Sequence, residues 1–193
     1  MIIMFIGPSS SGKDTFFNKS AEKYNLENIV LHTTRPIRTG EVDGINYHFV
    51  SMDTLNDMDN NNLLIERRNY DTKYGIWSYA TSSSSIDLSK DYIILNTWEG
   101  YKKFIEYYGA DIVVPFYFKL DDYIRLKRAL ERERNDENPK YDEMCRRYLA
   151  DKVDFDESYL KKYNPYIIDN NGTMEETSKQ IDNYMNLVLK RKN

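Results

Sequence analysis

The fold of this 193-residue chain is best predicted from one segment, Gly7-Pro8-Ser9-Ser10-Ser11-Gly12-Lys13-Asp14-Thr15. It follows the apolar run Ile2–Ile6 directly and leads into a segment of helical periodicity, so it joins a strand to a helix. Its glycines let successive backbone N–H groups point at phosphate oxygens, the helix N-terminus adds its positive end, and Lys13 can bridge the β- and γ-phosphates. The stretch therefore predicts a nucleoside triphosphate site formed by Gly7, Ser9, Ser10, Ser11, Gly12, Lys13, Asp14 and Thr15.

The residue after the lysine departs from the usual pattern, because Asp14 stands where Ser or Thr is common. A carboxylate beside triphosphate oxygens is repulsive unless it turns away. Thr15, one residue further on, can supply the hydroxyl instead, and the spacing G-K-x-T is used by several nucleoside monophosphate kinases. Thr15 is therefore the candidate ligand for a Mg²⁺ ion that accompanies the nucleotide.

Further apolar, β-branched or aromatic runs lie at 28–33, 92–97, 112–120 and Tyr166–Asp169, with segments of helical periodicity between several of them. This alternation predicts an α/β fold in which a parallel sheet is flanked by helices on both faces. In the last helix, Thr173 and Glu176 form a capping box. Its apolar residues recur at helical spacing, and basic residues 190–192 meet the C-terminal end of its dipole. The apolar residues are Ile181, Tyr184, Met185 and Val188.

Length and composition limit the possible classes of protein. With 40% hydrophobic and 14% aromatic residues, 193 residues are expected to fold as one domain. The 27 basic and 31 acidic residues give a net charge of −4, which excludes a general positive field for nucleic acid or an anionic membrane. The lone Cys145 excludes an internal disulfide and fits a reducing compartment. The first apolar run ends at Gly7 without a basic segment, so we expect a cytoplasmic protein with neither signal peptide nor membrane span.

Two segments interrupt the alternation. Residues 32 to about 85 contain a polar, hairpin-like run at 32–50 and polar tracts at 60–62 and 82–85, which predicts an inserted subdomain. Residues 121–152 hold nine basic and nine acidic side chains among 32 residues, so they cannot bury an apolar face over much of their length. Taken alone, this charged segment predicts a solvated pair of helices with surface ion pairs.

The run HTTRPIRTGEVDGINYHFV, residues 32–50, carries Arg35 and Arg38 three apart around a proline. Two guanidinium groups held by a stiff turn suit a dianionic monophosphate, which bidentate hydrogen bonds recognise well. The run resembles the signature of the guanylate kinase family, and the resemblance extends through most of the chain. It implies a single domain with the P-loop kinase fold. This domain would have a core (1–31, 86–120 and 153–193), a subdomain that binds a nucleoside monophosphate (32–85) and a helical lid (121–152).

The resemblance also implies which residues hold the acceptor nucleotide. Arg35, Arg38, Tyr47 and Tyr74 would bind its phosphate, and Glu66 would read its base. One carboxylate can accept from guanine N1–H and N2–H together, whereas the unprotonated N1 of adenine repels it. Asn96, also assigned to this site, stands where the family has an acidic residue at the end of a strand.

Two positions near the base depart from the family pattern. Leu31 and Ile76 replace serines that are common there, so the contacts to guanine are thinned while the phosphate contacts are intact. Three polar residues remain that can substitute for the missing hydroxyls, namely Ser78, Thr97 and Glu99.

On the donor side, the resemblance implies that Arg134 and Arg147 of the lid stabilise transition-state charge. Their neighbours Arg132 and Arg146 are expected to be solvated. Asn170, at the exit of the run Tyr166–Asp169, corresponds to the position where the family contacts adenine.

The implied reaction is transfer of the γ-phosphoryl group of ATP to GMP or dGMP, with Mg²⁺. The expected partners are these nucleotides, without nucleic acid or membrane, and the expected state is a monomer or homodimer. Two alternatives stay open: a kinase of the same fold with another phosphorylated acceptor, and a protein-binding module of this fold that has lost catalysis. The intact Gly12-Lys13 and both phosphate arginines argue against the module.

Overall fold

The computed structural model describes residues 1–38, 40–72 and 75–190. Within these residues the strands, in chain order, are β1 (Ile2–Ile6), β2 (Glu27–Asn28), β3 (His32–Thr33), β4 (His48–Phe49), β5 (Leu64–Thr72), β6 (Gly75–Ser82), β7 (Tyr92–Asn96), β8 (Val113–Lys119) and β9 (Tyr166–Asp169). The helices are α1 (Lys13–Tyr24), α2 (Met52–Asn60), α3 (Trp98–Tyr108), α4 (Asp122–Arg134), α5 (Tyr141–Asp154), α6 (Ser158–Tyr163) and α7 (Met174–Lys190), with a short 3₁₀ turn η1 at Ser83–Ser85.

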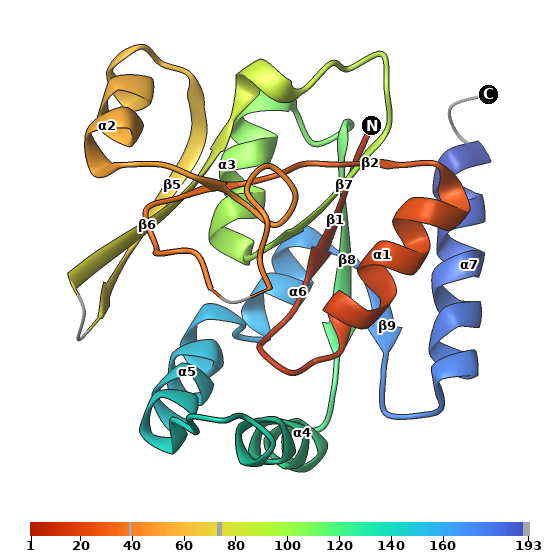
Figure 1. The fold of residues 1–193 in the computed structure, drawn as a ribbon. Coiled ribbons are helices and arrows are strands. Elements are labelled where there is room, and N and C mark those ends of the chain that lie inside the picture. The colour runs from red at the N-terminus through yellow and green to blue at the C-terminus, as the bar shows by residue number, and fades with distance from the viewer. Residues whose placement is uncertain (39, 73–74, 191–193) are drawn as a thin grey trace.

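The main sheet has the strand order β2-β7-β1-β8-β9, and each described pairing within it is parallel. All five residues of β1 are buried, because helices cover both faces of the sheet (Figure 1). Ile3 and Phe5 point to the face covered by α1 and α7, whereas Ile2 and Met4 point to the face covered by α3 and α6. This arrangement confirms the predicted α/β fold with a parallel sheet flanked by helices.

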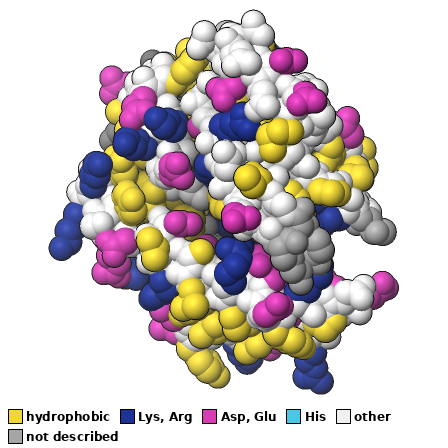
Figure 2. Space-filling view, turned by 90° about the vertical axis from the view of Figure 1, so that its left-hand side faces the viewer, with side chains coloured by type: hydrophobic (Ala, Val, Ile, Leu, Met, Phe, Trp, Pro, Cys, Tyr) yellow, Lys and Arg dark blue, Asp and Glu magenta, His cyan; other side chains and the backbone are white. Residues whose placement is uncertain are grey.

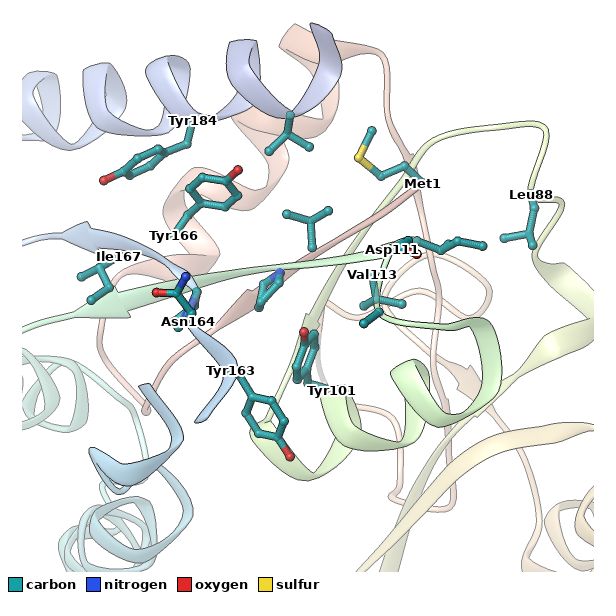
Figure 3. Close-up of a pocket in the computed structure, with 16 residues that line it drawn as sticks. Met1, Leu88, Tyr101, Asp111, Val113, Tyr163, Asn164, Tyr166, Ile167 and Tyr184 are labelled. Atoms are coloured by element: carbon teal, nitrogen blue, oxygen red, sulfur yellow. The ribbon is translucent and has the colours of Figure 1, made fainter. Parts of the chain in front are cut away.

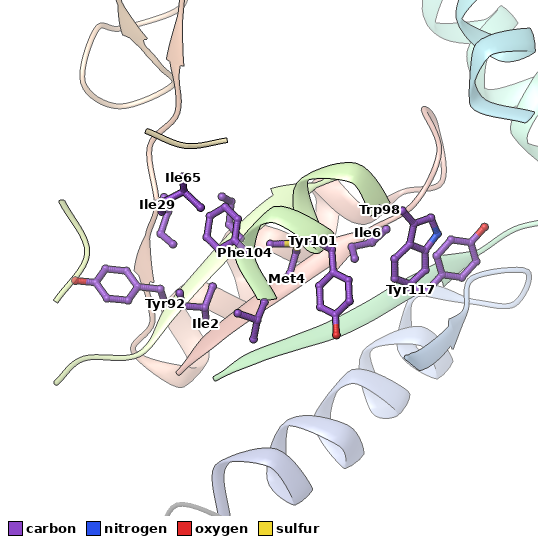
Figure 4. Close-up of a cluster of buried hydrophobic side chains, with 12 residues drawn as sticks. Ile2, Met4, Ile6, Ile29, Ile65, Tyr92, Trp98, Tyr101, Phe104 and Tyr117 are labelled. Atoms are coloured by element: carbon purple, nitrogen blue, oxygen red, sulfur yellow. The ribbon is translucent and has the colours of Figure 1, made fainter. Parts of the chain in front are cut away.

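The second face of the sheet is closed by aromatic side chains (Figure 4). The Trp98 ring, 1% exposed, stacks on Tyr117 of β8 with ring centroids 5.6 Å apart and on Tyr163 of α6 at 5.5 Å. Phe104 of α3 and Ile65 of β5 join the same cluster. Ile65 therefore ties the second sheet to the core, and α3 lies between the two.

The second sheet has the order β4-β3-β6-β5 and lies within residues 32–82. It corrects two sequence-based expectations. The run 28–33 is two short strands in different sheets, since Asn28 pairs with Ile93 whereas His32 pairs with Ala80 and His48. The run 32–50 is not a hairpin, because β3 and β4 are parallel. The Gly44 N–H donates to the Tyr47 carbonyl, and this turn, in which Gly44 has φ of +77°, redirects the chain before His48.

The charged segment forms two helices, α4 and α5, which pack on each other below the edge of the main sheet (Figure 1). α5 continues to Asp154, two residues beyond the expected end of the lid. The capping box of α7 is confirmed, with Thr173 N–H donating to Glu176 Oε2 at 2.8 Å and Glu176 N–H donating to Thr173 Oγ1 at 3.2 Å. Among the described residues, none of the helices is long and apolar enough to cross a membrane.

Candidate active site

The site lies where the carboxyl ends of the parallel strands meet. Ile6, the last residue of β1, is in register with Asn96 at the end of β7 and with Tyr117 near the end of β8. The loop of residues 7–12 follows at once and leads into α1. Ligands of open α/β sheets bind at this edge, so the phosphate loop stands where the topology favours a nucleotide.

The side chain of Asn170 supports the phosphate loop by a hydrogen bond. The Asn170 Nδ2 donates to the Ser11 carbonyl at 2.7 Å, and Thr177 Oγ1 of α7 donates to Asn170 Oδ1 at 2.9 Å. A Cβ atom on Gly12 would collide with the Asn170 amide, and Gly12 has φ of +87°, so glycine is required there. The buried Asn170 side chain thus supports the loop from the strand exit expected to contact adenine.

The loop presents several polar groups whose bonds are unmade or long. The buried hydroxyls of Ser10 and Ser11 have no partner within the described part of the chain. Among the described residues, the Lys13 Nζ reaches only the Pro8 carbonyl, at 3.4 Å, and Asp14, at 3.9 Å. Asp14 and Thr15 are exposed in the first turn of α1. Buried polar groups are normally satisfied, so the unmade bonds indicate a place for a polar ligand.

One amide of the loop is bonded to the charged segment. The Ser9 N–H donates to Asp151 Oδ2 of α5 at 2.9 Å. The same oxygen accepts from Arg125 Nη1 of α4 at 3.1 Å, and the Arg125 side chain is only 3% exposed. Arg128 Nη1 stands 3.3 Å from the position that a Gly12 Cβ would take. Both helices therefore contact the phosphate loop directly.

The arginines that the sequence analysis assigned to the lid, Arg134 and Arg147, have surroundings that differ from those of Arg125 and Arg128. Arg134 is exposed in the last turn of α4. Arg147 Nη2 donates to Glu133 Oε1 at 3.3 Å. Sequence reasoning missed Arg125, Arg128 and Asp151, because nothing in a run of nine basic and nine acidic residues singles them out. The contacts across two helices identify them.

The acceptor arginines lie on the second sheet and differ in their surroundings. The Arg35 side chain, 3% exposed, donates to both Glu41 oxygens at 2.7 and 3.0 Å and lies over the rings of Tyr47 and Phe49. Burial lowers the pKa of Arg35, but the interactions with Glu41 and Tyr79 together outweigh it, so this pKa lies above its ordinary value. Arg38 is exposed, and its backbone N–H donates to Glu41.

Tyr47 packs beside Arg35, with its ring centroid 5.7 Å from that of Tyr79 and 5.9 Å from that of Phe49. Burial and the neighbouring Tyr79 raise the pKa of its hydroxyl, against the opposing effect of the Arg35 charge. The expected phosphate ligand Tyr74 lies outside the described residues.

The expected base reader Glu66 is buried, and its carboxylate is occupied. Arg68 Nε donates to Oε2 at 2.8 Å, Arg68 Nη2 donates to Oε1 at 3.3 Å, and Thr81 Oγ1 donates to Oε1 at 2.9 Å. Arg68 was not singled out from the sequence, because a charged residue two places along a strand is ordinary. The register of β5 puts both side chains on one face.

Two of the polar residues left to replace the missing serines, Ser78 and Thr97, are engaged elsewhere, whereas Glu99 is exposed in the first turn of α3. Ser78 Oγ donates to Asn69 Oδ1 at 2.6 Å. Thr97 caps α3 through the Gly100 N–H and accepts from Arg68 Nη1 at 3.3 Å. Asn96 is buried at the end of β7, where its Oδ1 accepts from the Thr97 N–H at 2.9 Å and its Nδ2 has no partner within the described residues.

A cavity of about 1010 Å³ lies at the opposite edge of the main sheet (Figure 3). Met1 and Val113, which stand at the starts of β1 and β8, line it together with Tyr166 and Tyr184. Because the phosphate loop follows the other ends of these strands, the cavity is separate from the candidate active site. Among the described residues there is also no group of three or more His, Cys, Asp or Glu side chains that could hold a metal ion.

Comparison with known proteins agrees with this geometry. The family model for guanylate kinase matches residues 1–187. Guanylate kinase of Zymomonas mobilis is 27% identical over 187 residues, covering 96% of this chain and 82% of that protein. Guanylate kinase of Helicobacter hepaticus is 30% identical over 140 residues, covering 70% and 68%. The crystal structure of guanylate kinase from Anaplasma phagocytophilum has the same fold, with a TM-score of 0.66, 23% identity and coverage of 97% and 85%.

The fold and the phosphate loop define an ATP-dependent nucleoside monophosphate kinase of the P-loop class. Within that class, the chain belongs to the guanylate kinase family.

Proposed function

We propose that this chain transfers the γ-phosphoryl group of ATP to GMP or dGMP, giving ADP and the corresponding diphosphate. The observation that carries the proposal is the presence of two anion sites, a phosphate loop after β1 with buried hydroxyls that lack partners among the described residues, and a buried Arg35 guanidinium over the Tyr47 ring on the second sheet. The acceptor phosphate is already anionic, so the reaction requires positioning and neutralisation of charge rather than a general base.

The donor site is assigned to the loop residues Gly7, Ser9, Ser10, Ser11, Gly12, Lys13, Asp14 and Thr15. Their backbone N–H groups would hold the phosphates, and Lys13 would neutralise charge that grows toward the transition state. The long contacts of Lys13 support this, because the ammonium is poorly engaged without a phosphate. Asn170 would hold the loop in place rather than act only on adenine.

A bound Mg²⁺ would polarise the phosphoryl oxygens and shield their charge. The residues present fit this ion, since Mg²⁺ keeps several waters and takes few protein ligands beside the phosphates. The Thr15 hydroxyl is exposed beside the loop and would serve as that ligand.

The acceptor site is assigned to Arg35, Arg38, Tyr47, Tyr74, Glu66 and Asn96. Arg35 is held rigidly by Glu41, and Arg38 is free to turn toward a phosphate, so one guanidinium is preorganised and the other completes the site. Among the lid arginines, Arg134 and Arg147 remain assigned to charge stabilisation, and the position of Arg128 beside Gly12 supports adding it to them.

The three-part division also remains a proposal, supported by the separate sheet within 32–82 and by the helix pair α4 and α5. We propose action in the cytoplasm as a monomer or homodimer, without nucleic acid or membrane. The mixture of acidic and basic side chains on the face in Figure 2 supports the absence of a polyanion partner.

A coupled assay of ADP release with GMP, dGMP, IMP, AMP, UMP and CMP tests the proposal. GMP or dGMP should give the highest kcat/KM. Faster reaction with another monophosphate would favour the alternative acceptor. An absence of ADP release with every acceptor, in a protein that binds nucleotide, would favour the protein-binding module.

A further inference from the structure

The Glu66 carboxylate and the Arg68 guanidinium form one buried unit. The Glu66 side chain is 1% exposed and that of Arg68 10%, so Arg68 is the more accessible half of the pair. Burial lowers the pKa of Arg68, but the charge of Glu66 leads the effects that raise it, so this pKa lies above its ordinary value. Any base that reaches Glu66 must therefore meet Arg68 as well.

The guanidinium has donors left over. Among the described residues, its three hydrogen bonds go to Glu66 Oε1, Glu66 Oε2 and Thr97 Oγ1, whereas an arginine side chain carries five N–H donors. Guanine presents an acceptor, O6, beside the donors N1–H and N2–H. A carboxylate can serve the two donors, but it cannot serve O6. Leu31 and Ile76 are apolar, so neither side chain can donate to O6.

We propose that Arg68 is a second base-reading residue, which donates to guanine O6 when Glu66 accepts from N1–H and N2–H. The Arg68 fork occupies the Glu66 oxygens in this structure, so binding of the base requires the guanidinium to turn from the carboxylate toward O6. Pairing an arginine with guanine O6 is a strong means of selecting guanine, and adenine opposes it with an amino group at the same position. This inference rests on the proposed function, because it requires a guanine nucleotide as acceptor.

Two pairs of substrates separate the roles of the two residues. GMP and IMP differ only in the amino group at C2, which Glu66 would read. GMP and 6-thio-GMP differ only in the atom on C6, which Arg68 would read, and sulfur is a weaker acceptor than oxygen. For the wild type, we expect kcat/KM for GMP to exceed that for each analogue by about tenfold or more.

The test is a kinetic comparison of wild type, R68M and E66Q on these substrates. In R68M the preference for GMP over 6-thio-GMP should shrink to within about twofold, because the variant lacks the guanidinium that would donate to O6. In E66Q the preference for GMP over IMP should shrink instead. R67M is the matched control, because Arg67 points to the other face of β5 and bonds to Asn56 and Asp59 at 2.9 and 3.3 Å. Its ratios should stay at the wild-type values.

Removing Arg68 leaves a buried carboxylate without its counter-charge, which can prevent folding. The comparison of E66Q with the double variant E66Q/R68M avoids an unpaired carboxylate, because residue 66 is a neutral glutamine in both, and the double variant leaves neither buried charge unpaired. The preference for GMP over 6-thio-GMP should fall from the first to the second. An unchanged preference in both comparisons, or tighter binding of GMP by R68M, would show that Arg68 serves only as the counter-charge of Glu66 and would overturn the inference. Wild-type turnover of GMP tests the proposed function separately.

Discussion

The Asp151 Oδ2 atom accepts the Ser9 N–H of the phosphate loop at 2.9 Å, so a carboxylate of α5 occupies one of the donors that we assign to the phosphates of ATP. Arg125 holds the same oxygen at 3.1 Å, which fixes the carboxylate in this position. In the proposed donor site, this anionic side chain stands in for an anionic ligand, and ATP would have to displace it.

We expect D151N to bind ATP about fivefold or more tightly than the wild type, because it removes a like charge worth ~1 kcal/mol from the path of the phosphates. Isothermal titration calorimetry with ATP alone measures this. D122N is the control, since Asp122 also pairs with Arg125 but, among the described residues, makes no hydrogen bond or ion pair with the loop. Equal or weaker binding by D151N would mean that Asp151 does not compete with ATP.

K13M should fold normally and lose kcat by roughly 10²-fold or more, because the charge of Lys13 acts mainly in the transition state. Lys13 makes only contacts of 3.4 Å or longer in this structure, so its removal should leave the thermal midpoint near that of the wild type. Steady-state kinetics and thermal unfolding check both statements. Near-normal turnover would contradict the assignment of the donor site.

R38A should raise KM for GMP by roughly tenfold or more and leave KM for ATP unchanged, because a hydrogen bond to a charged group contributes about 1.5–3 kcal/mol. Its stability should be preserved, since the Arg38 side chain is exposed. R35A provides the contrast: it should weaken GMP binding and also lower the thermal midpoint, because Arg35 is buried against Glu41. Equal effects of R38A on both substrates would show that the acceptor site is misplaced.

Hydrogen exchange in residues 121–152 should slow when ATP analogue and GMP are bound together. The two helices bury few apolar side chains, and bound nucleotides would supply an anion for Arg128 and compete with Glu133 for Arg147. Mass spectrometry of exchanged peptides gives the comparison, with α7 as an internal reference. Exchange that stays unchanged in α4 and α5 would refute the role of a lid.

The acceptor subdomain should lose stability in mild acid through His32. Burial, followed by the neighbouring His48 ring 4.8 Å away, lowers the pKa of His32 below 6.5. The folded state therefore binds fewer protons than the unfolded chain, so this contribution is complete above pH 6.5 and is lost as the pH falls toward the lowered value. The urea midpoint should fall more between pH 7.5 and 5.5 for the wild type than for H32N. Equal losses in both would exclude His32 as the cause.

The parallel sheet, the phosphate loop and the capped last helix could be predicted because each depends on local order in the sequence. Ile2–Ile6 is a continuous apolar run, and the glycines of the loop follow it at fixed spacing. The division of 28–33 between two sheets could not be predicted, because three residues of loop do not reveal which partner each short strand will find.

Within the site, the sequence could not show which side chains pair with partners that are distant along the chain. Glu66 is recognisable from its motif, but its attachment to Arg68 and Thr81 depends on the register of β5 with β6. In the same way, Arg125 and Arg128 resemble the other lid arginines until the helices are packed. Sequence identifies residues that carry chemistry, whereas only the fold shows which charges already neutralise one another.

The place where the chain leaves and rejoins the main sheet has a mechanical consequence. β2 ends at Asn28 and β7 begins at Tyr92, and these neighbouring strands are joined by the Glu27–Lys90 ion pair and the bond from Ile29 N–H to the Ile93 carbonyl. The chain between them, which includes Arg35, Arg38 and Glu66, joins the main sheet through two connections that lie side by side, and it packs on the core through Ile65. A rotation of this segment about the two adjacent connections would move the phosphate contacts and the base contact of the acceptor site together, as one rigid unit. GMP could then be brought to ATP without any change in the shape of the phosphate loop.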